Sequence, residues 1–502
     1  MDFLDPKKKR AYHIRLIVGY ILVAIVIGLG SLILVYAASG YGINTKTGQI
    51  VQNGLLFVDS QPGGAKVILN GKDNNITTSA RLVLASGEYK LDIKKDGYRP
   101  WSRNFTLAEQ SIARYVYPFL FPVKPLTTNL KTYDSQPAFM TQSPDRKWLL
   151  VENDSASSKT VVFDQFDTTT LDQNTPDETT VSIPEGLLTN FGDSSTVSEV
   201  EWSTDNNNVL LKHSYNGGSE FVVFNRAHPD QSFNVNSLLG ITPSQVNLFD
   251  KKTDKLYIYS QTDQTLRLAD IKQKSLEPVL LKHVLAFKPY AKNIITYITN
   301  NNESAGQVKA QIWDNGKFYK LSEFNVGSTY LIDAAQFQGN FYYAVGSNTA
   351  NSINVYKNPE DSIRDPAIGR AIPTIGLHDP GATMLKFSDN TRFIGVESGQ
   401  NFAVYDIETE SSYQYTLSDP LAGEAVWMDG HRFLGQSNGS VLVMDYDGIN
   451  KQLLTPTTLS RGGFFSQDYK HLLTISASSD GSPVLQDVDM RAGTDLPKAK
   501  QQ

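Results

Sequence analysis

The apolar residues of the chain follow two patterns, and the change between them lies near residue 40. Residues 16–38 form one run without a charged side chain. As a helix, with a rise of about 1.5 Å per residue, this run is roughly 34 Å long, which suffices for a hydrocarbon layer of about 30 Å. Beyond it, short apolar stretches alternate with polar turns up to about residue 490. The pattern therefore predicts one transmembrane helix followed by an all-β region.

The charges that flank the apolar run predict its orientation. The basic cluster Lys7–Arg10 precedes the run, whereas the first basic residue after it is Lys46. The positive-inside rule then makes residues 1–15 a cytoplasmic tail and places the bulk of the chain outside the cell membrane. A cleaved signal peptide is the alternative, but its apolar core has only about 7–15 residues. We expect a retained single-pass anchor.

The segment after the anchor predicts a small β-sandwich. Residues 39–54 are polar, contain several glycines and are expected to form a stalk. Within residues 55–121, short runs alternate apolar and polar side chains, and turn dipeptides separate them. The expected strands lie in Leu55–Ser60, Ala65–Gly71, Arg81–Gly87, Glu88–Lys95, Trp101–Leu107 and Ile112–Leu120.

Groups of turn residues follow one another in this segment: Ser60-x-Pro62-Gly63-Gly64-Ala65-x-Val67, Asn70-Gly71-Lys72, Gly87-x-Tyr89 and Gly97-Tyr98. Together they resemble the PEGA domain, a family named for its Pro-Glu-Gly-Ala signature, although Gly63 stands where the signature has Glu. The resemblance covers residues 55–121 and implies a module of the kind found in bacterial and archaeal surface proteins. It implies an accessory or surface-binding role, and it supplies neither an enzymatic activity nor site residues.

Residues 125–490 repeat one pattern of strands eight times. In most units a short strand with an aromatic residue near its end precedes a turn, a longer apolar strand and a third strand that often ends in Asp. The spacing of roughly 40 to 60 residues overlaps the length of propeller blades, so we expect a seven- or eight-bladed β-propeller. The longer strands begin at Lys147, Asn208, Lys255, Asn293, Asn340, Arg392, Arg432 and His471.

The ends of the repeat region predict how the ring closes. Seven units leave room for a fourth strand, whereas the eighth ends near Met490 in a polar tail, residues 491–502. Residues 127–133, upstream of the first unit, are expected to complete the last blade, because closure removes open sheet edges. The turn Ser143–Leu149 resembles the repeats of periplasmic Tol-type propellers, which are similar to Trp-Asp repeats, and this resemblance implies a fold only.

The composition excludes several kinds of site. The chain has no cysteine, which rules out disulfides, cysteine-based zinc sites and thiol catalysis. The formal net charge is -6, and the first 15 residues contribute +3, which leaves -9 for the remainder. An acidic body lacks the basic face that nucleic-acid binding needs, so we expect no nucleic-acid partner.

The residues that usually carry chemistry form no recognisable motif. The histidines have neither HExxH nor another paired metal spacing, and no GxSxG, phosphate-loop or dinucleotide fingerprint occurs. We therefore assign no catalytic, cofactor-binding or metal-ligating residue and no cofactor. Acidic residues from distant units could still meet at the centre of a propeller, but the sequence does not select them. Ordinary strand or loop roles are expected for most of His13, His213, His228, His283, His378, His431 and His471.

Two inserts stand out between the predicted strands. Asp164–Thr180 is rich in Asp and Thr, whose oxygens suit Ca²⁺, but it lacks the spacing of an EF-hand and is expected to be a solvated loop. Lys357–Gly381 contains four prolines. It is the candidate partner-binding loop, because loops of this length are often functional.

These patterns predict a membrane-anchored surface protein that acts as a non-enzymatic binding or scaffold platform for an envelope protein or polysaccharide. The alternative is a membrane-tethered propeller hydrolase or lyase that acts on envelope glycans, and a third reading is an envelope sensor that signals through a membrane partner. Propellers host both binding and catalysis, so the fold does not decide. A central funnel with converging carboxylates or histidines would favour the enzyme, and one filled by apolar side chains would favour the platform.

Overall fold

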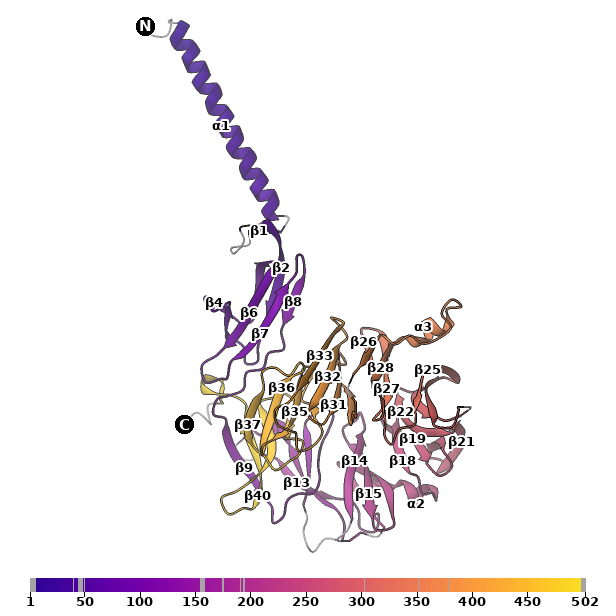
Figure 1. The fold of residues 1–502 in the computed structure, drawn as a ribbon. Coiled ribbons are helices and arrows are strands. Elements are labelled where there is room, and N and C mark those ends of the chain that lie inside the picture. The colour runs from indigo at the N-terminus through magenta and orange to yellow at the C-terminus, as the bar shows by residue number, and fades with distance from the viewer. Residues whose placement is uncertain are drawn as a thin grey trace. The chain divides into compact units, whose positions relative to one another are not determined.

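The computed structural model describes residues 6–38, 40–43, 48, 50–153, 159–173, 176–189, 191–192, 195–301, 303–350, 352–378 and 380–497 (Figure 1). The chain forms two compact units. The first contains the N-terminal part up to Lys124 together with the C-terminal segment from Arg491, and the second contains Pro125–Met490. The chain therefore passes from the first unit into the second and returns to the first.

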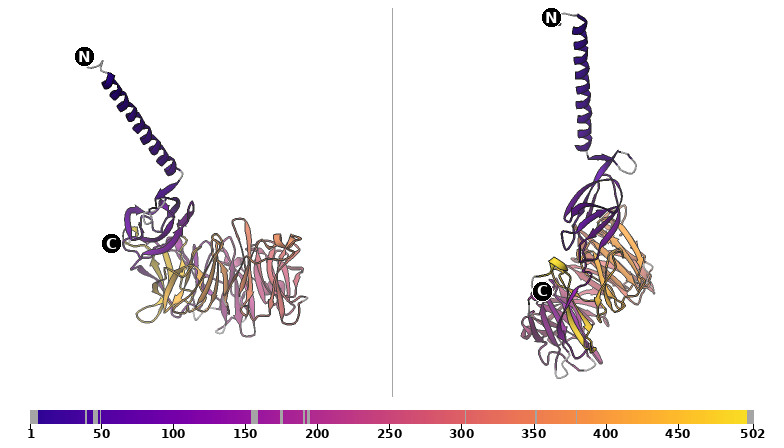
Figure 2. Two further views of the ribbon diagram at one scale, coloured as in Figure 1. Left: turned by 45° about the horizontal axis from the view of Figure 1, so that its top comes forward. Right: turned by 90° about the vertical axis from the view of Figure 1, so that its left-hand side faces the viewer.

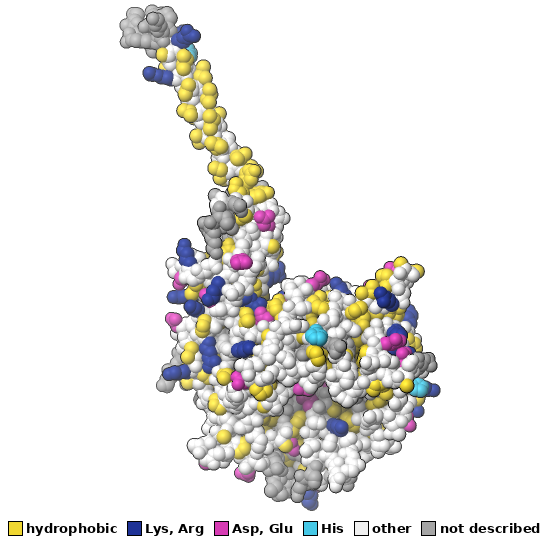
Figure 3. Space-filling view, in the orientation of Figure 1, with side chains coloured by type: hydrophobic (Ala, Val, Ile, Leu, Met, Phe, Trp, Pro, Cys, Tyr) yellow, Lys and Arg dark blue, Asp and Glu magenta, His cyan; other side chains and the backbone are white. Residues whose placement is uncertain are grey.

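Helix α1, Pro6–Ala38, is the one long helix in the described part of the chain. Its segment Lys9–Tyr36 is long and apolar enough to cross a membrane, and none of that segment is buried. Hydrophobic side chains cover the helix along its length, and Lys and Arg side chains gather at its start (Figure 3). A helix that exposes apolar side chains on every side suits an apolar surrounding rather than water.

Two four-stranded sheets follow the helix in the first unit. In one sheet the central strand β2 pairs antiparallel with β1 and β5 and parallel with β8; the other has the order β4-β3-β6-β7. The strands are β1 Tyr41–Ile43, β2 Ile50–Val58, β3 Lys66–Leu69, β4 Lys72–Thr77, β5 Ala80–Ala85, β6 Gly87–Lys94, β7 Trp101–Leu107 and β8 Ile112–Tyr115.

Alternate side chains of both sheets form one apolar core, which includes Leu56 from β2, Leu91 from β6 and Trp101 from β7. The stalk expected at residues 39–54 needs a correction. Tyr41 lies opposite Gln52 in the β1–β2 pair, so strand pairing begins almost directly after α1. Backbone pairing with a neighbouring strand outweighs the polar local composition there.

The C-terminal segment, expected to be a polar tail, packs on the first unit. The Tyr98 hydroxyl accepts a hydrogen bond from the Ala492 backbone N–H at 2.8 Å and donates one to Asp495 at 2.8 Å. Lys95 forms an ion pair with the same carboxylate at 2.8 Å. Gly97 has a positive φ of 82°, and a Cβ there would lie 3.1 Å from the Ala492 Cβ, so glycine suits both the turn and the contact.

The second unit consists of eight four-stranded antiparallel sheets in its described residues, which is the arrangement of a β-propeller (Figure 2). The first seven sheets are meanders of consecutive strands. Their strands are β10 Met140–Gln142, β11 Trp148–Glu152, β12 Val162–Asp167, β13 Glu178–Ser182; β14 Thr196–Trp202, β15 Asn208–Tyr215, β16 Gly218–Asn225, β17 Phe233–Asn234; β18 Gln245–Phe249, β19 Lys252–Ser260, β20 Thr265–Asp270, β21 Ser275–Lys282; β22 Val284–Tyr290, β23 Ile294–Thr299, β24 Gln307–Asp314, β25 Lys317–Asn325; β26 Tyr330–Phe337, β27 Asn340–Ser347, β28 Ile353–Lys357, β29 Ile375–Leu377; β30 Met384–Phe387, β31 Phe393–Ser398, β32 Asn401–Asp406, β33 Ser411–Thr416; and β34 Val426–Trp427, β35 Arg432–Ser437, β36 Ser440–Asp445, β37 Gln452–Pro456.

The eighth sheet joins the two ends of this unit. It consists of β38 Phe464–Phe465, β39 His471–Ala477, β40 Pro483–Asp489 and β9 Leu126–Thr132. Strand β9 runs antiparallel to β40, with Leu126 opposite Asp489 and Thr132 opposite Val484. This is the pairing expected from the missing fourth strand of the last unit.

Apolar clusters between the sheets hold the ring together. Leu149 and Phe166 of the first sheet share a buried cluster with Leu473 and Leu485 of the eighth sheet, so the first and last sheets pack directly on one another. Large apolar residues also fill the space between neighbouring sheets elsewhere, as Phe163 and Phe224 do between the first and second. Buried aromatic and aliphatic surface of this kind is the main favourable term in folding.

Lys131 of β9 reaches the first sheet and corrects the expectation for Asp164–Thr180. Its ammonium group lies 2.9 Å from Asp164 and 2.5 Å from Glu178. Asp164 is fully buried in β12 and is therefore not part of a solvated loop. Burial opposes the charge on Lys131, but its hydrogen bonds to Glu178 and Asp164 raise its pKa above the ordinary value.

The recurring Ser-x-Asp turn has a structural purpose. Ser143 donates a hydrogen bond to Asp145 at 2.6 Å and accepts one from the Trp148 backbone N–H at 3.0 Å. The backbone N–H of Lys147 donates to the same carboxylate at 3.1 Å. Equivalent bonds occur at Ser388 to Asn390 and at Ser466 to Asp468. In these sheets the motif satisfies backbone groups of the turn that leads into the second strand.

Candidate functional site

A pocket of about 500 Å³ lies where five of the eight sheets of the second unit converge. Its volume falls within the range of small-molecule sites, which is about 300–1,000 Å³. Residues that are distant in the sequence meet there because the first strand of each sheet, or the turn next to it, faces the pocket. Each of the five sheets contributes at least one lining residue; examples, one per sheet, are Gln142, Glu199, Asp389, Trp427 and Arg461.

Arg146 ties three of these sheets together at the pocket. One of its guanidinium nitrogens, Nη2, donates to Asp389 at 2.6 Å and to the Met428 backbone carbonyl at 2.7 Å. The guanidinium also lies 4.6 Å from the centre of the Tyr469 ring. Its other terminal nitrogen, Nη1, is buried without a hydrogen-bond partner. Burial raises the pKa of Asp389, and the nearby Arg146 charge opposes this effect.

Arg461 is the unusual member of the site. Its guanidinium lies 4.0 Å from the centre of the Phe464 ring and lines the pocket. Its Nε atom is buried without a hydrogen-bond partner, and Arg461 forms no ion pair with any residue in the described ranges. Burial lowers its pKa, Glu199 opposes that shift and Arg146 adds to it. An arginine charge that is desolvated and left without an acceptor is unfavourable, so its presence needs an explanation.

Glu199 supplies a fixed negative charge on the other side of the pocket. It lies in β14 and accepts a hydrogen bond of 2.5 Å from the Thr141 hydroxyl. Thr141 is fully buried and accepts a hydrogen bond of 2.7 Å from the Trp202 indole N–H. Glu199 also borders a second hollow of about 460 Å³, together with Lys212 and Lys288. Its orientation is therefore set by the neighbouring sheet.

The lining of the pocket combines cations, hydrogen-bond donors and aromatic surface. Trp427, Phe464 and Phe465 supply the aromatic surface. Two carboxylates reach the pocket, but both already accept hydrogen bonds from protein donors. No histidine lines the pocket within the described ranges. The arrangement is equipped to hold a polar, negatively charged ligand rather than to exchange protons with it.

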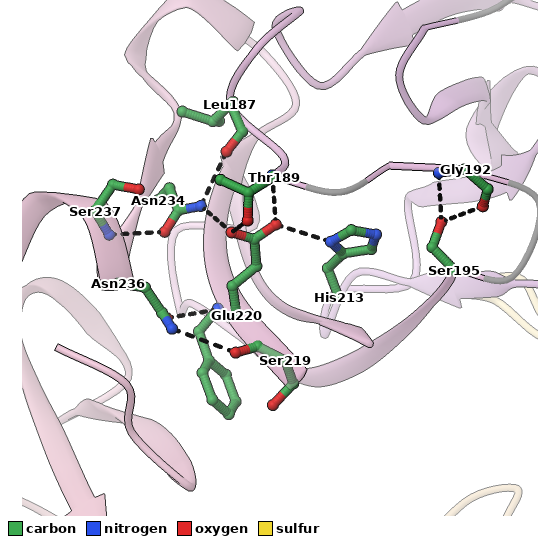
Figure 4. Close-up of polar contacts among 11 residues, drawn as sticks. Leu187, Thr189, Gly192, Ser195, His213, Ser219, Glu220, Asn234, Asn236 and Ser237 are labelled. Carbon is green, nitrogen blue, oxygen red and sulfur yellow. Dashed lines mark hydrogen bonds and ion pairs between the residues drawn. The ribbon is translucent and has the colours of Figure 1, made fainter. Parts of the chain in front are cut away.

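His213 belongs to a buried network in the second sheet (Figure 4). Its Nδ1 lies 2.8 Å from Glu220, whose carboxylate also accepts hydrogen bonds from the Thr189 backbone and hydroxyl and from the Asn234 amide. His213 Nε2 is buried without a partner. The Ser195 hydroxyl turns instead to the Gly192 carbonyl, 2.7 Å away. The network fixes the segment around Thr189, and among the described residues no hydroxyl forms a hydrogen bond with the imidazole.

Asp172, His471 and Asp489 form a group with metal-ligand chemistry, because their donor atoms all lie within 4.8 Å of one another. His471 and Asp489 occupy opposite positions at the ends of β39 and β40. Arg432 and Asp445 occupy the same positions in the preceding sheet and form an ion pair at 3.7 Å. His471 itself pairs with Asp487 at 2.8 Å and with Asp172 at 3.3 Å, so both of its ring nitrogens have carboxylate partners and we assign no metal to the group.

His431 predicts a specific pH dependence of stability. Burial lowers its pKa to about 4, with Asp429 opposing the shift. An unfolded histidine has a pKa of about 6.5, so the unfolded state gains a proton first as the pH falls. We expect the free energy of unfolding to fall by up to about 3 kcal/mol between pH 6.5 and pH 4, and to lose no more through this residue below pH 4. Denaturant titrations of the His431→Gln variant should show a smaller loss over the same interval, and equal losses in both proteins would contradict the prediction.

The outward face of the first sheet in the first unit carries a second set of exposed groups. Arg81 and Arg114 flank Phe57 in register, and their guanidiniums lie 5.9 Å and 5.6 Å from its ring centre. The next row along the sheet is apolar, with Val83 and Ile112 more than half exposed on either side of Leu55. A face that combines cations with apolar groups is suited to contact rather than to solvation alone.

The sequence-based expectations placed no residue in the pocket, and the structure explains why. Its members come from five sheets, and Arg146 and Asp389 are 243 positions apart. One local signal existed. Arg146 has a φ of 61° at a turn position where the second sheet has Asn206, the residue type that tolerates this conformation best after glycine. The long insert Lys357–Gly381 folds partly into helix α3, Pro359–Arg364, and takes no part in the pocket.

Residues 53–116 match the model of the PEGA domain, which confirms the resemblance seen in the turn residues. The match covers this part of the chain alone. No curated protein matches the chain.

Three solved β-propellers are examples of structures that are similar to this chain. The Dos1 propeller is 15% identical with a TM-score of 0.42, covering 74% of this chain and 96% of that one. Dihydro-heme d1 dehydrogenase NirN in complex with DHE is 11% identical with a TM-score of 0.43, covering 73% and 79%. Hsv2p of Kluyveromyces lactis is 9% identical with a TM-score of 0.38, covering 72% and 100%. None of them is named as a Tol-type protein, so that resemblance stays a prediction.

Proposed function

We propose that the protein is a single-pass membrane protein with a non-enzymatic binding platform outside the cell membrane, and that the propeller holds an envelope polysaccharide or protein. The observation that carries the proposal is Arg461, a half-buried cation that faces a pocket of ligand size and whose buried Nε has no hydrogen-bond partner among the described residues. A ligand that supplies the missing acceptor explains a charge that is otherwise unfavourable. Helix α1 supports anchoring, and the PEGA match supports a surface-facing location.

The first unit supports the same role. Arg81, Phe57 and Arg114 offer an exposed row of cations around an aromatic ring on a sheet that begins next to α1. Such a row suits contact with an envelope polymer close to the membrane. The propeller adds a rigid support, because its sheets pack on one another around a closed ring.

A hydrolase or lyase that acts on envelope glycans is the second candidate. Glu199 and Asp389 favour it, because both carboxylates reach the pocket. Burial raises the pKa of Asp389 although the Arg146 charge opposes this, which suits a general acid, but the Arg146 guanidinium already occupies this carboxylate and the Thr141 hydroxyl occupies that of Glu199. Incubation with envelope glycans should leave their chain length unchanged. New reducing ends or unsaturated products that disappear in Asp389→Asn would establish the enzyme instead.

The membrane orientation has its own test. In intact cells made permeable only at the cell wall, added protease is expected to remove residues beyond 50, while an epitope before Pro6 stays protected. Replacing Lys7–Arg10 with glutamines should lower the fraction of protein with this orientation, because the basic cluster sets it. The same replacement at four exposed lysines of the propeller serves as the control. Protection of the propeller until the membrane is lysed would show the opposite topology.

A further inference from the structure

We propose that the pocket of the propeller binds the oxyanion of an acidic envelope glycan, a carboxylate or a phosphate, and that Arg461 is the residue that binds it. This inference rests on the proposed function and adds the chemistry of the ligand. It starts from Arg461, because the described surroundings give its guanidinium an aromatic contact but no acceptor. Arginine presents a planar fork of N–H donors that matches carboxylate and phosphate groups.

The position of Arg461 prepares it for an anion. The guanidinium lies over the Phe464 ring, 4.0 Å from its centre, and this contact holds it without using its N–H donors. Arg146 adds a second positive charge at the same pocket, and its Nη1 also lacks a partner. Arg146 is already neutralised by Asp389, at 2.6 Å, whereas Arg461 is not neutralised by contact with any described acid. Glu199 and Asp389 balance the two arginine charges in number, but Arg461 is the cation that is in contact with neither carboxylate.

The rest of the lining selects a saccharide as the carrier of the anion. Trp427 offers a partly exposed ring, whereas the rings of Phe464 and Phe465 are 2% and 3% exposed, and Gln142 offers its amide oxygen, since its nitrogen donates to the Arg146 and Phe465 carbonyls. A sugar presents apolar C–H faces and a rim of hydroxyls, which match aromatic surface and hydrogen-bonding groups respectively. The volume of about 500 Å³ admits a short stretch of a chain rather than a folded protein surface.

Glu199 allows a second test, in which a substitution is expected to strengthen binding of the anion. Its carboxylate lines the pocket and acts electrostatically on Arg461. An anion that binds Arg461 is repelled by Glu199, so neutralising Glu199 should strengthen binding. Removing Arg461 should weaken binding without lowering stability, because a half-buried cation whose buried Nε lacks an acceptor does not stabilise the fold. A residue with a purely structural role would show neither effect.

The experiment measures binding of three labelled probes to the full chain in detergent: an oligouronate, an oligo(glycerol phosphate) and a neutral oligoglucose of similar length. Binding of at least one acidic probe is expected, and the neutral probe should bind at least tenfold more weakly. Arg461→Met should weaken acidic binding roughly tenfold to hundredfold, the range expected for one charged hydrogen-bonding partner. Arg461→Lys should fall between the two, Glu199→Gln should bind severalfold more tightly, and Lys272→Gln, a charge-matched exposed control, should bind like the wild type.

Thermal unfolding completes the test. The melting temperature of Arg461→Met should equal or exceed that of the wild type. Equal binding of neutral and acidic probes, no binding of either acidic probe, or unchanged binding in Arg461→Met would each overturn the anion assignment. None of these outcomes affects the membrane topology, which the protease experiment measures separately. The uronate and phosphate arms show which oxyanion the pocket prefers.

Discussion

Removal of Leu126–Thr132 is expected to abolish cooperative folding of the propeller unit. The deletion takes away the whole of β9 and so exposes the edge of β40 over its full length. It also removes Leu130, which packs in the cluster between the first and last sheets, and disturbs the adjoining Tyr133, which is 5% exposed there. Losing large core residues costs about 2–5 kcal/mol each, and a domain is stabilised by only about 5–15 kcal/mol in total.

The measurement is a denaturant titration of the full chain in detergent, followed by tryptophan fluorescence. The wild type should unfold in a sharp transition, and the deletion variant should show a broad transition or none. Thr128→Ala, at an exposed position of the same strand, is the matched control and should unfold like the wild type. A deletion variant with an unchanged midpoint and slope would show that β9 is dispensable.

Lys131→Met is expected to lower the free energy of unfolding by about 2–4 kcal/mol. The ammonium group of Lys131 neutralises Asp164, which is fully buried, at a distance of 2.9 Å. Without Lys131, the charged carboxylate stays in the interior with two weaker neutral hydrogen bonds among the described residues, to Asn153 at 3.3 Å and to Thr180 at 3.4 Å, and with the Tyr133 hydroxyl nearby. A buried charge that has lost its partner is strongly destabilising.

A double-mutant cycle separates this effect from the loss of packing. The Lys131→Met/Asp164→Asn variant removes both charges and should recover a large part of the stability lost in Lys131→Met alone. Glu178→Gln changes the more exposed partner of the same lysine and should have a smaller effect. If the effects of Lys131→Met and Asp164→Asn on the free energy of unfolding simply add, so that the double variant recovers no stability, the two charges do not form a stabilising pair.

The strands of the propeller could be predicted from sequence because their signals are local. Phe393–Ser398 and Asn401–Asp406, for example, are short apolar runs separated by a turn, and the structure pairs them in one hairpin. The role of β9 followed from the absence of a fourth strand after β40. That argument needed only the count of strands in the other units and the physical cost of an open sheet edge.

The environment of individual polar residues could not be predicted in the same way, because it depends on partners far along the chain. Asp164 lies in an Asp- and Thr-rich stretch that looks solvated, yet β12 buries it and Lys131 neutralises it. The sequence around Arg461 has no unusual feature. That its buried Nε lacks a hydrogen-bond partner becomes evident only when the surrounding sheets are in place. The pairing of Tyr41 with Gln52 likewise overrides a glycine-containing, polar local sequence.

The route of the chain also sets the order in which a nascent protein can be completed. The PEGA-containing unit is synthesised early, but Tyr98 and Lys95 receive Ala492 and Asp495 only after the whole propeller has been synthesised. Within the propeller unit, β9 is synthesised first but has no partner strand until β40 has been synthesised. A polypeptide that ends before Ala492 would therefore leave the positions beside Tyr98 and Lys95 unfilled, in the unit that was synthesised first.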